Sequence, residues 1–141
     1  PIEVQPVVTT TQLEALQQDC RRSYVDPALM QYAVKLVAAT REPARFGLGE
    51  LAGYISCGAS PRATIALVEC GRALAFLRGR AYVLPQDIVD IAPDVLRHRL
   101  SLSYEALADA TGADAIVQRI LQRVPQPARP LQDQWQKAAN E

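Results

Sequence analysis

The chain has 141 residues, of which 49% are hydrophobic and 21% charged, proportions typical of one globular domain. Its 15 lysines and arginines balance its 15 aspartates and glutamates, so no net charge attracts nucleic acid or an anionic membrane. No apolar run is long enough to insert into a membrane, and three cysteines without paired spacing favour a reducing, cytoplasmic compartment.

The first 40 residues predict a linker and two amphipathic helices. Residues 1–10 contain two prolines and alternating valines, which is typical of an extended segment arriving from an upstream domain. Thr11 and Glu14 have the spacing of a capping box, and Asp26-Pro27 is a favourable start for the second helix. Because the sequence begins without an initiator methionine, we expect a domain excised from a longer protein.

Residues 42–59 are rich in glycine and predict one long, mobile loop that contacts a partner. Gly47, Gly49 and Gly53 imitate a dinucleotide-binding motif. The last spacing is one residue too long, and the segment follows a helix rather than a strand, so we do not expect a phosphate-binding turn here.

The third predicted helix covers residues 61–78, with Ser60 as its N-cap and Pro61 in its first turn. Its apolar residues occur on nearly all sides, which predicts a place at the centre of a bundle. Arg62 is unusual, because it puts a cation at the positive end of the helix dipole, where carboxylates are favoured. One explanation is an external anion such as phosphate; the other is that Arg62 is solvated or paired with an acid from another segment.

The rest of the chain predicts short extended segments and two more helices. Residues 82–84 and 100–104 are expected to be extended. A helix opening at Pro85, with Asp87 in its first turn, should be interrupted or kinked at Pro93, and Thr111 should start the last helix. The fold class is therefore all-α, a bundle of five or six helices. We expect the helical domain to cover residues 11–124 and a flexible tail to cover residues 125–141.

The residues provide no catalytic constellation. His98 is the only histidine, and no serine or cysteine is recognisably placed for activation by it. The carboxylates are scattered, so we expect no metal site, and no phosphate-binding loop motif occurs. The isolated chain is therefore not expected to be an enzyme.

Several motifs, in the same order, resemble the C-terminal lid domain of MoxR-type AAA+ ATPases. The segments that carry the resemblance are Tyr24-Val-Asp-Pro-Ala-Leu29, Ala39-Thr-Arg41, Gly58-Ala-Ser-Pro-Arg-Ala63, Leu77-Arg-Gly-Arg-Ala-Tyr-Val83, Pro85-x-Asp87 and Ala92-Pro-x-Val-Leu-Arg-His-Arg-Leu100. The likeness extends over residues 10–124.

This resemblance implies that Arg62 is the sensor-2 arginine, which reaches toward the β- and γ-phosphates of ATP. Gly58, Ala59, Ser60 and Pro61 would shape the helix end that presents it. The resemblance further implies ATP and Mg as cofactors of a parent ATPase, with none expected on the isolated domain. It implies as partners the AAA+ core of the same polypeptide, neighbouring subunits of a chaperone-like hexamer, and a client with a von Willebrand factor A domain.

The alternative is a helical adaptor that binds a protein or a nucleic acid. Its basic face would consist of the arginines Arg72, Arg78, Arg80, Arg97 and Arg99. Neutral net charge and the lack of aromatic residues among these arginines argue against nucleic acid.

Overall fold

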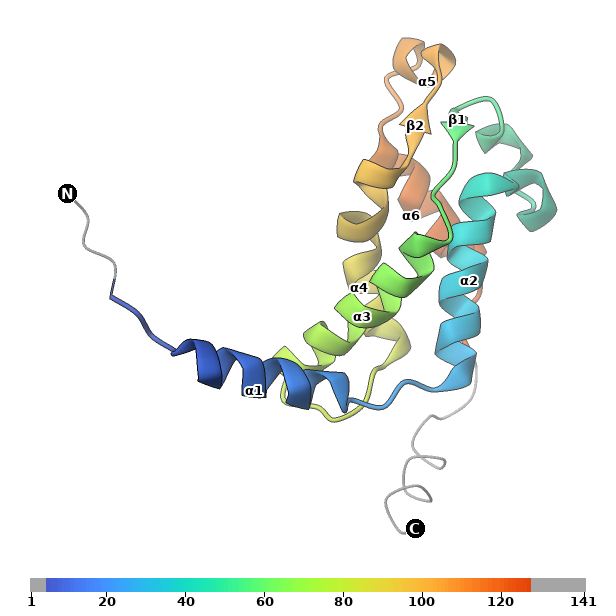
Figure 1. The fold of residues 1–141 in the computed structure, drawn as a ribbon. Helices are drawn as coiled ribbons and strands as arrows, with labels where there is room; N and C mark the ends of the chain where they lie inside the picture. The colour runs from blue at the N-terminus through green and yellow to red at the C-terminus, as the bar shows by residue number, and fades with distance from the viewer. Residues whose placement is uncertain (1–4, 128–141) are drawn as a thin grey trace.

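The computed structural model describes residues 5–127, which form an α-helical domain with one very small sheet (Figure 1). The helices are α1 (Thr10–Arg21), α2 (Pro27–Arg41), α3 (Arg62–Leu77), α4 (Pro85–Leu96), α5 (Tyr104–Ala108) and α6 (Ala113–Arg123). Three 3-10 helices, η1 (Pro43–Phe46), η2 (Gly49–Leu51) and η3 (Arg97–Arg99), and two strands, β1 (Ile55–Cys57) and β2 (Ser101–Leu102), complete it. The predicted all-α class is confirmed.

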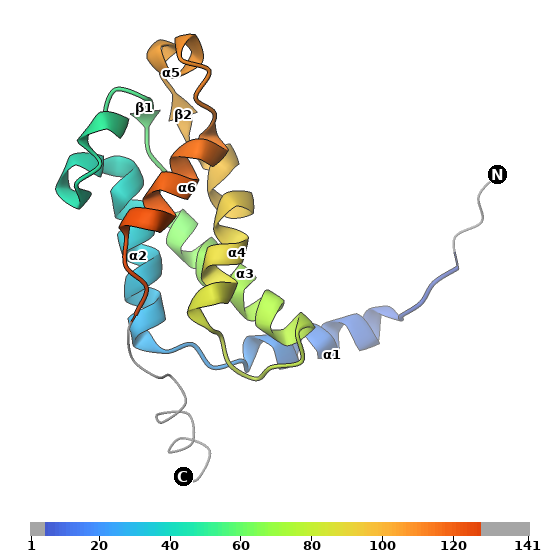
Figure 2. The same cartoon turned by 180° about the vertical axis from the view of Figure 1, so that it is seen from behind.

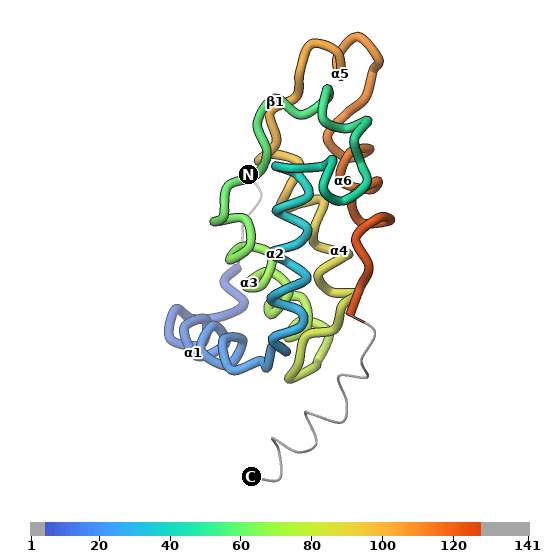
Figure 3. The backbone as a smooth tube through the Cα atoms, turned by 90° about the vertical axis from the view of Figure 1, so that its right-hand side faces the viewer, coloured from blue at the N-terminus to red at the C-terminus, as the bar shows by residue number. Residues whose placement is uncertain are grey.

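Helices α2, α3, α4 and α6 lie side by side and enclose the core, as the front and rear views show (Figures 1 and 2). The strands and α5 lie at one end of this bundle, and α1 lies at the opposite end (Figure 3). Helix α2 begins as predicted, because the Asp26 carboxylate accepts a hydrogen bond of 2.7 Å from the Ala28 amide. Its predicted apolar face, which includes Leu29, Leu36 and Thr40, is buried.

The glycine-rich segment is not one long loop. It contains η1, η2 and β1, and it contributes Leu48 and Leu51 to the core. Strand β1 pairs antiparallel with β2, with Ile55 opposite Leu102. The sequence therefore predicted the extended residues near 100–104 but missed the strand at 55–57. The missing information is a pairing between distant residues, which local patterns do not encode.

Several predicted helix boundaries are wrong. The first capping box joins Thr9 to Gln12, so Thr10 lies in a helix rather than in the linker. Helix α4 is not interrupted at Pro93, because burial of its core side, including Ala92, Val95 and Leu96, offsets the lost hydrogen bond and the steric cost of the proline ring. Gly112, rather than Thr111, precedes α6, and α5 was not predicted. Residues 1–4 of the predicted linker and 128–141 of the predicted tail lie outside the described residues.

Helix α3 packs against α1, α2 and α4, but it is not enclosed on all sides. Its buried stripe is Ala63, Leu67, Gly71 and Ala75. At Gly71 an added Cβ would lie 2.6 Å from Ile88 Cδ1, so the glycine lets α4 approach closely. Leu77 keeps 81% of its surface exposed, because three neighbouring helices cover only part of the α3 circumference.

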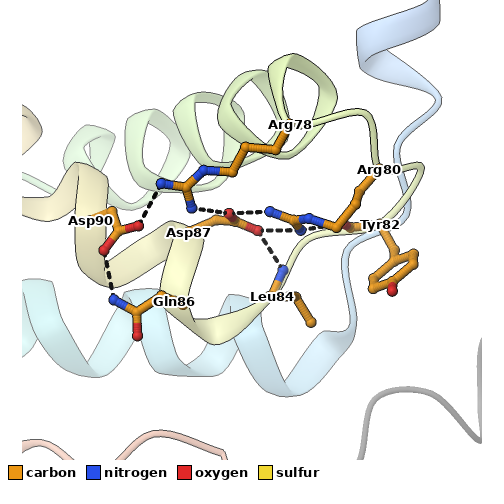
Figure 4. Close-up of polar contacts among 7 residues, drawn as sticks. All are labelled: Arg78, Arg80, Tyr82, Leu84, Gln86, Asp87 and Asp90. Atoms are coloured by element: carbon orange, nitrogen blue, oxygen red, sulfur yellow. Dashed lines mark hydrogen bonds and ion pairs between the residues drawn. The ribbon is translucent and has the colours of Figure 1, made fainter.

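The C-terminal end of α3 is held by a buried ion-pair network (Figure 4). Asp87 is fully buried and accepts hydrogen bonds from Arg78 (2.8 Å), from Arg80 (2.7 Å) and from the Leu84 amide (2.8 Å). Arg78 also reaches Asp90 at 2.7 Å. Burial acts to raise the pKa of Asp87, but the Arg80 hydrogen bond and the other donors outweigh it, so this pKa lies below its ordinary value.

The opposite end of α3 is tied to the end of α2 by Thr40. Its buried hydroxyl donates to the Val37 carbonyl (2.7 Å) and accepts from the Ala59 amide (2.9 Å). Gly58 lies directly against this joint, because a Cβ added there would clash with the Thr40 carbonyl oxygen. The sequence just before α3 therefore has a fixed position relative to α2.

We expect Asp87→Asn to lower the free energy of unfolding of the chain by about 1.5–3 kcal/mol at pH 7, because Arg78 and Arg80 lose their charged acceptor. The folded-state pKa is depressed, so the stabilisation is complete above the unfolded pKa of about 3.9 and is lost as pH falls through the folded value. Urea unfolding at pH 7, 5 and 3 measures this, with exposed Asp94→Asn as the control. A deficit that stays constant down to pH 3 would contradict the assignment.

Thr40→Val should lower the free energy of unfolding by about 1–3 kcal/mol, because it keeps the side-chain shape but leaves the buried Ala59 amide without an acceptor. Thr40→Ser retains the hydroxyl and is the matched control. Urea unfolding, together with hydrogen exchange of the Ala59 amide, measures the effect. A valine variant with unchanged stability and a fully protected Ala59 amide would show that Thr40 does not anchor this joint.

Candidate functional site

Arg62 is the first residue of α3, and its side chain is exposed. Within residues 5–127 it forms no ion pair and no side-chain hydrogen bond. Glu69, the nearest acid along the helix, pairs with Arg72 at 3.3 Å. The structure therefore shows no internal pairing of Arg62, and of the explanations that the sequence left open, a solvated side chain and an external anion remain.

The backbone before Arg62 differs from the prediction in one respect. Pro61 is the N-cap, with φ −55° and ψ −24°, and Ser60 does not cap the helix with its side chain. Instead, the Ser60 carbonyl accepts from the Ala63 amide (2.8 Å) and the Pro61 carbonyl accepts from the Thr64 amide (3.0 Å). Because Pro61 is already helical, these carbonyls close a tight first turn. Two of the amides expected to hold an anion are therefore occupied by backbone carbonyls.

An open pocket of about 400 Å³ lies beside this helix end. It brings four of the predicted residues together with three others, and Arg62 itself is not in its lining, which is Arg41, Ser56, Cys57, Gly58, Ala59, Ser60 and Pro61. The lining contains one cation and no carboxylate, and Arg62 follows its last member directly. The pocket is therefore suited to an anion rather than to a cation.

Arg41 is the residue of this site that the sequence analysis missed. It is the last residue of α2 and enters the pocket because Thr40 bonds to Ala59 across the joint. The sequence signal was Ala39-Thr-Arg41, which appeared only as part of the family resemblance. Its distance along the chain from residues 58–61 hid the fact that it lines the same pocket as these residues.

The arginines proposed as an alternative basic face are all engaged within the fold. Their partners are Glu69 for Arg72, Asp87 for Arg78 and Arg80, Asp94 and Asp114 for Arg97, and the Val95 carbonyl for Arg99. These contacts neutralise or orient the guanidinium groups, which weakens the case for a nucleic-acid surface.

The other reactive side chains among residues 5–127 form no second candidate site. His98 is exposed and lies against Arg99. Among residues 5–127 no group of three or more histidine, cysteine or acidic side chains is arranged to hold a metal ion. None of the helices in this part of the chain has the length and apolar character needed to cross a bilayer.

Comparison with known proteins places this geometry in a family. Residues 51–120 match the AAA lid domain model. The chain is 41% identical over 127 residues to the chaperone MoxR1 of Mycobacterium tuberculosis, covering 90% of this chain and 34% of that protein. It is 38% identical over 112 residues to protein MoxR of Paracoccus denitrificans, covering 75% of this chain and 33% of that protein.

A crystal structure of a proposed ATPase from Cytophaga hutchinsonii has the same fold, with a TM-score of 0.84 and 39% identity. The match covers 88% of this chain and 38% of that one. The chain thus spans about a third of the length of the curated relatives it matches. The order of its motifs, its helical architecture and these matches together show that the chain belongs to the AAA lid domain family and is a lid of the MoxR type.

Proposed function

We propose that this lid senses the nucleotide of an ATP-hydrolysing parent protein, and that Arg62 contacts the β- and γ-phosphates of ATP. The observation that carries the proposal is an exposed guanidinium that has no partner among residues 5–127 and that follows directly on a pocket whose lining has no carboxylate. The residues present fit a polyphosphate, since a planar guanidinium donates two parallel hydrogen bonds to phosphate oxygens.

The proposed role follows from charge. When ATP and Mg are bound by the AAA+ core of the same polypeptide, Arg62 stabilises negative charge on the phosphates and favours the transition state for phosphoryl transfer. Loss of the γ-phosphate removes part of this attraction. Because the Thr40 joint fixes the start of α3 to α2, the change would be transmitted to the lid as a rigid body and would rotate it against the core.

The proposed assembly is a chaperone-like hexamer, in which neighbouring subunits share the nucleotide sites. The name of the M. tuberculosis relative, a chaperone, supports an action on other proteins, and we propose a client with a von Willebrand factor A domain. We place the parent protein in the cytoplasm, where its three free cysteines would stay reduced.

Arg62→Ala should leave the free energy of unfolding of the chain nearly unchanged, because the side chain is exposed and has no partner within residues 5–127. In the full-length protein it should lower the rate of ATP hydrolysis about 100-fold, the usual effect of removing one charge-stabilising donor. Arg22→Ala, at an exposed arginine on the other end of the bundle, is the control. Full ATPase activity in the Arg62 variant would contradict the sensor role.

A further inference from the structure

Arg41 borders the same pocket as the residues that lead into Arg62, but it comes from a different helix. Its stem lies against Gly58, where an added Cβ would be 2.8 Å from Arg41 Cγ. The Thr40 hydroxyl, one residue earlier, bonds to the Ala59 amide. These two contacts hold the Cγ atom of Arg41 next to residues 58–61, the segment that precedes α3.

The lining of the pocket offers Arg41 no carboxylate as a partner. Glu42, the adjacent acid, pairs with Arg45 at 2.6 Å, and none of the residues that line the pocket is acidic. Within the described part of the chain, Arg41 makes no ion pair and no side-chain hydrogen bond. Arg41 thus lines an acid-free pocket, and the second unpaired guanidinium belongs to Arg62, the residue that directly follows Pro61 in the pocket lining.

Resting on the nucleotide-sensing function proposed above, we propose that Arg41 is a second phosphate-binding residue of the lid. It acts with Arg62, and together the two guanidinium groups hold the polyphosphate of a nucleoside di- or triphosphate from two sides. With Ala63 and Thr64 amides bonded to Ser60 and Pro61, a second cation supplies donors that the helix end does not.

Arg41 is the last residue of α2, so its charge interacts favourably with the negative end of the helix dipole. This is a structural role that any cation at this position would fulfil. A phosphate contact differs from this structural effect in two ways. It requires the planar guanidinium rather than a charge alone, and it changes nucleotide affinity rather than stability. The two roles are therefore separable by experiment.

The test uses the full-length protein and isothermal titration with Mg-AMP-PNP and with ADP. Arg41→Gln, which keeps most of the aliphatic stem, should weaken AMP-PNP binding about tenfold. Arg41→Lys should bind with an intermediate Kd. The difference in affinity between each variant and the wild type should become smaller as the KCl concentration is raised. Arg45→Gln is the matched control, since this nearby exposed arginine is paired outside the pocket and should keep the wild-type Kd. Arg62→Gln, measured in parallel, tests the function on which the inference rests.

An unchanged Kd in Arg41→Gln, with weakened binding in Arg62→Gln, would overturn the role of Arg41 and leave the sensor function standing. Unchanged binding in both variants would overturn both. Thermal melting of each variant checks that the lid remains folded. If Arg41→Gln fails to fold, Arg41→Lys decides: an intermediate Kd supports the contact, and a wild-type Kd overturns it.

Discussion

The site depends on one buried hydroxyl, that of Thr40. It links the last turn of α2 to the backbone that leads into α3, by donating to Val37 and accepting from Ala59. Gly58 permits the close approach, because no other residue fits against the Thr40 carbonyl without a shift. The consequence is a joint that keeps Arg41 beside residues 58–61, the segment that leads into Arg62.

Helix α3 has opposite electrostatic environments at its two ends. At its C-terminal end, Arg78 forms ion pairs with Asp87 and Asp90, and Arg80 forms an ion pair with Asp87, whose carboxylate is buried (Figure 4). At its N-terminal end, Arg62 has no partner within residues 5–127. The first arrangement stabilises the fold, and the second leaves charge available for a ligand. A net charge of zero for the whole chain conceals this separation.

The sequence predicted those features that short segments determine. The start of α2 is fixed by the hydrogen bond between the Asp26 carboxylate and the Ala28 amide, two residues later in the chain. Arg62 is unusual because it is a cation in the first turn of its own helix. Features that need distant contacts were missed. Strand β1 exists because it pairs with β2, and Arg41 enters the site because α2 is bonded to Ala59.

Errors of cap position have a different origin. Ser60 has the side chain of a good N-cap, but the helical backbone at Pro61 moved the cap by one residue and replaced side-chain capping with carbonyl contacts. This small shift changes the chemistry of the site. It takes two amides out of the predicted anion site, so the proposed phosphate contact depends on the guanidinium groups of Arg62 and Arg41 rather than on the helix end.

The most direct test is a structure of the full-length protein with Mg-AMP-PNP. The account predicts that Arg62 donates hydrogen bonds of about 2.7–2.9 Å to phosphate oxygens, with the Thr40–Ala59 contact intact. A structure in which Arg62 pairs with a carboxylate of the core, or faces solvent away from the bound nucleotide, would contradict it.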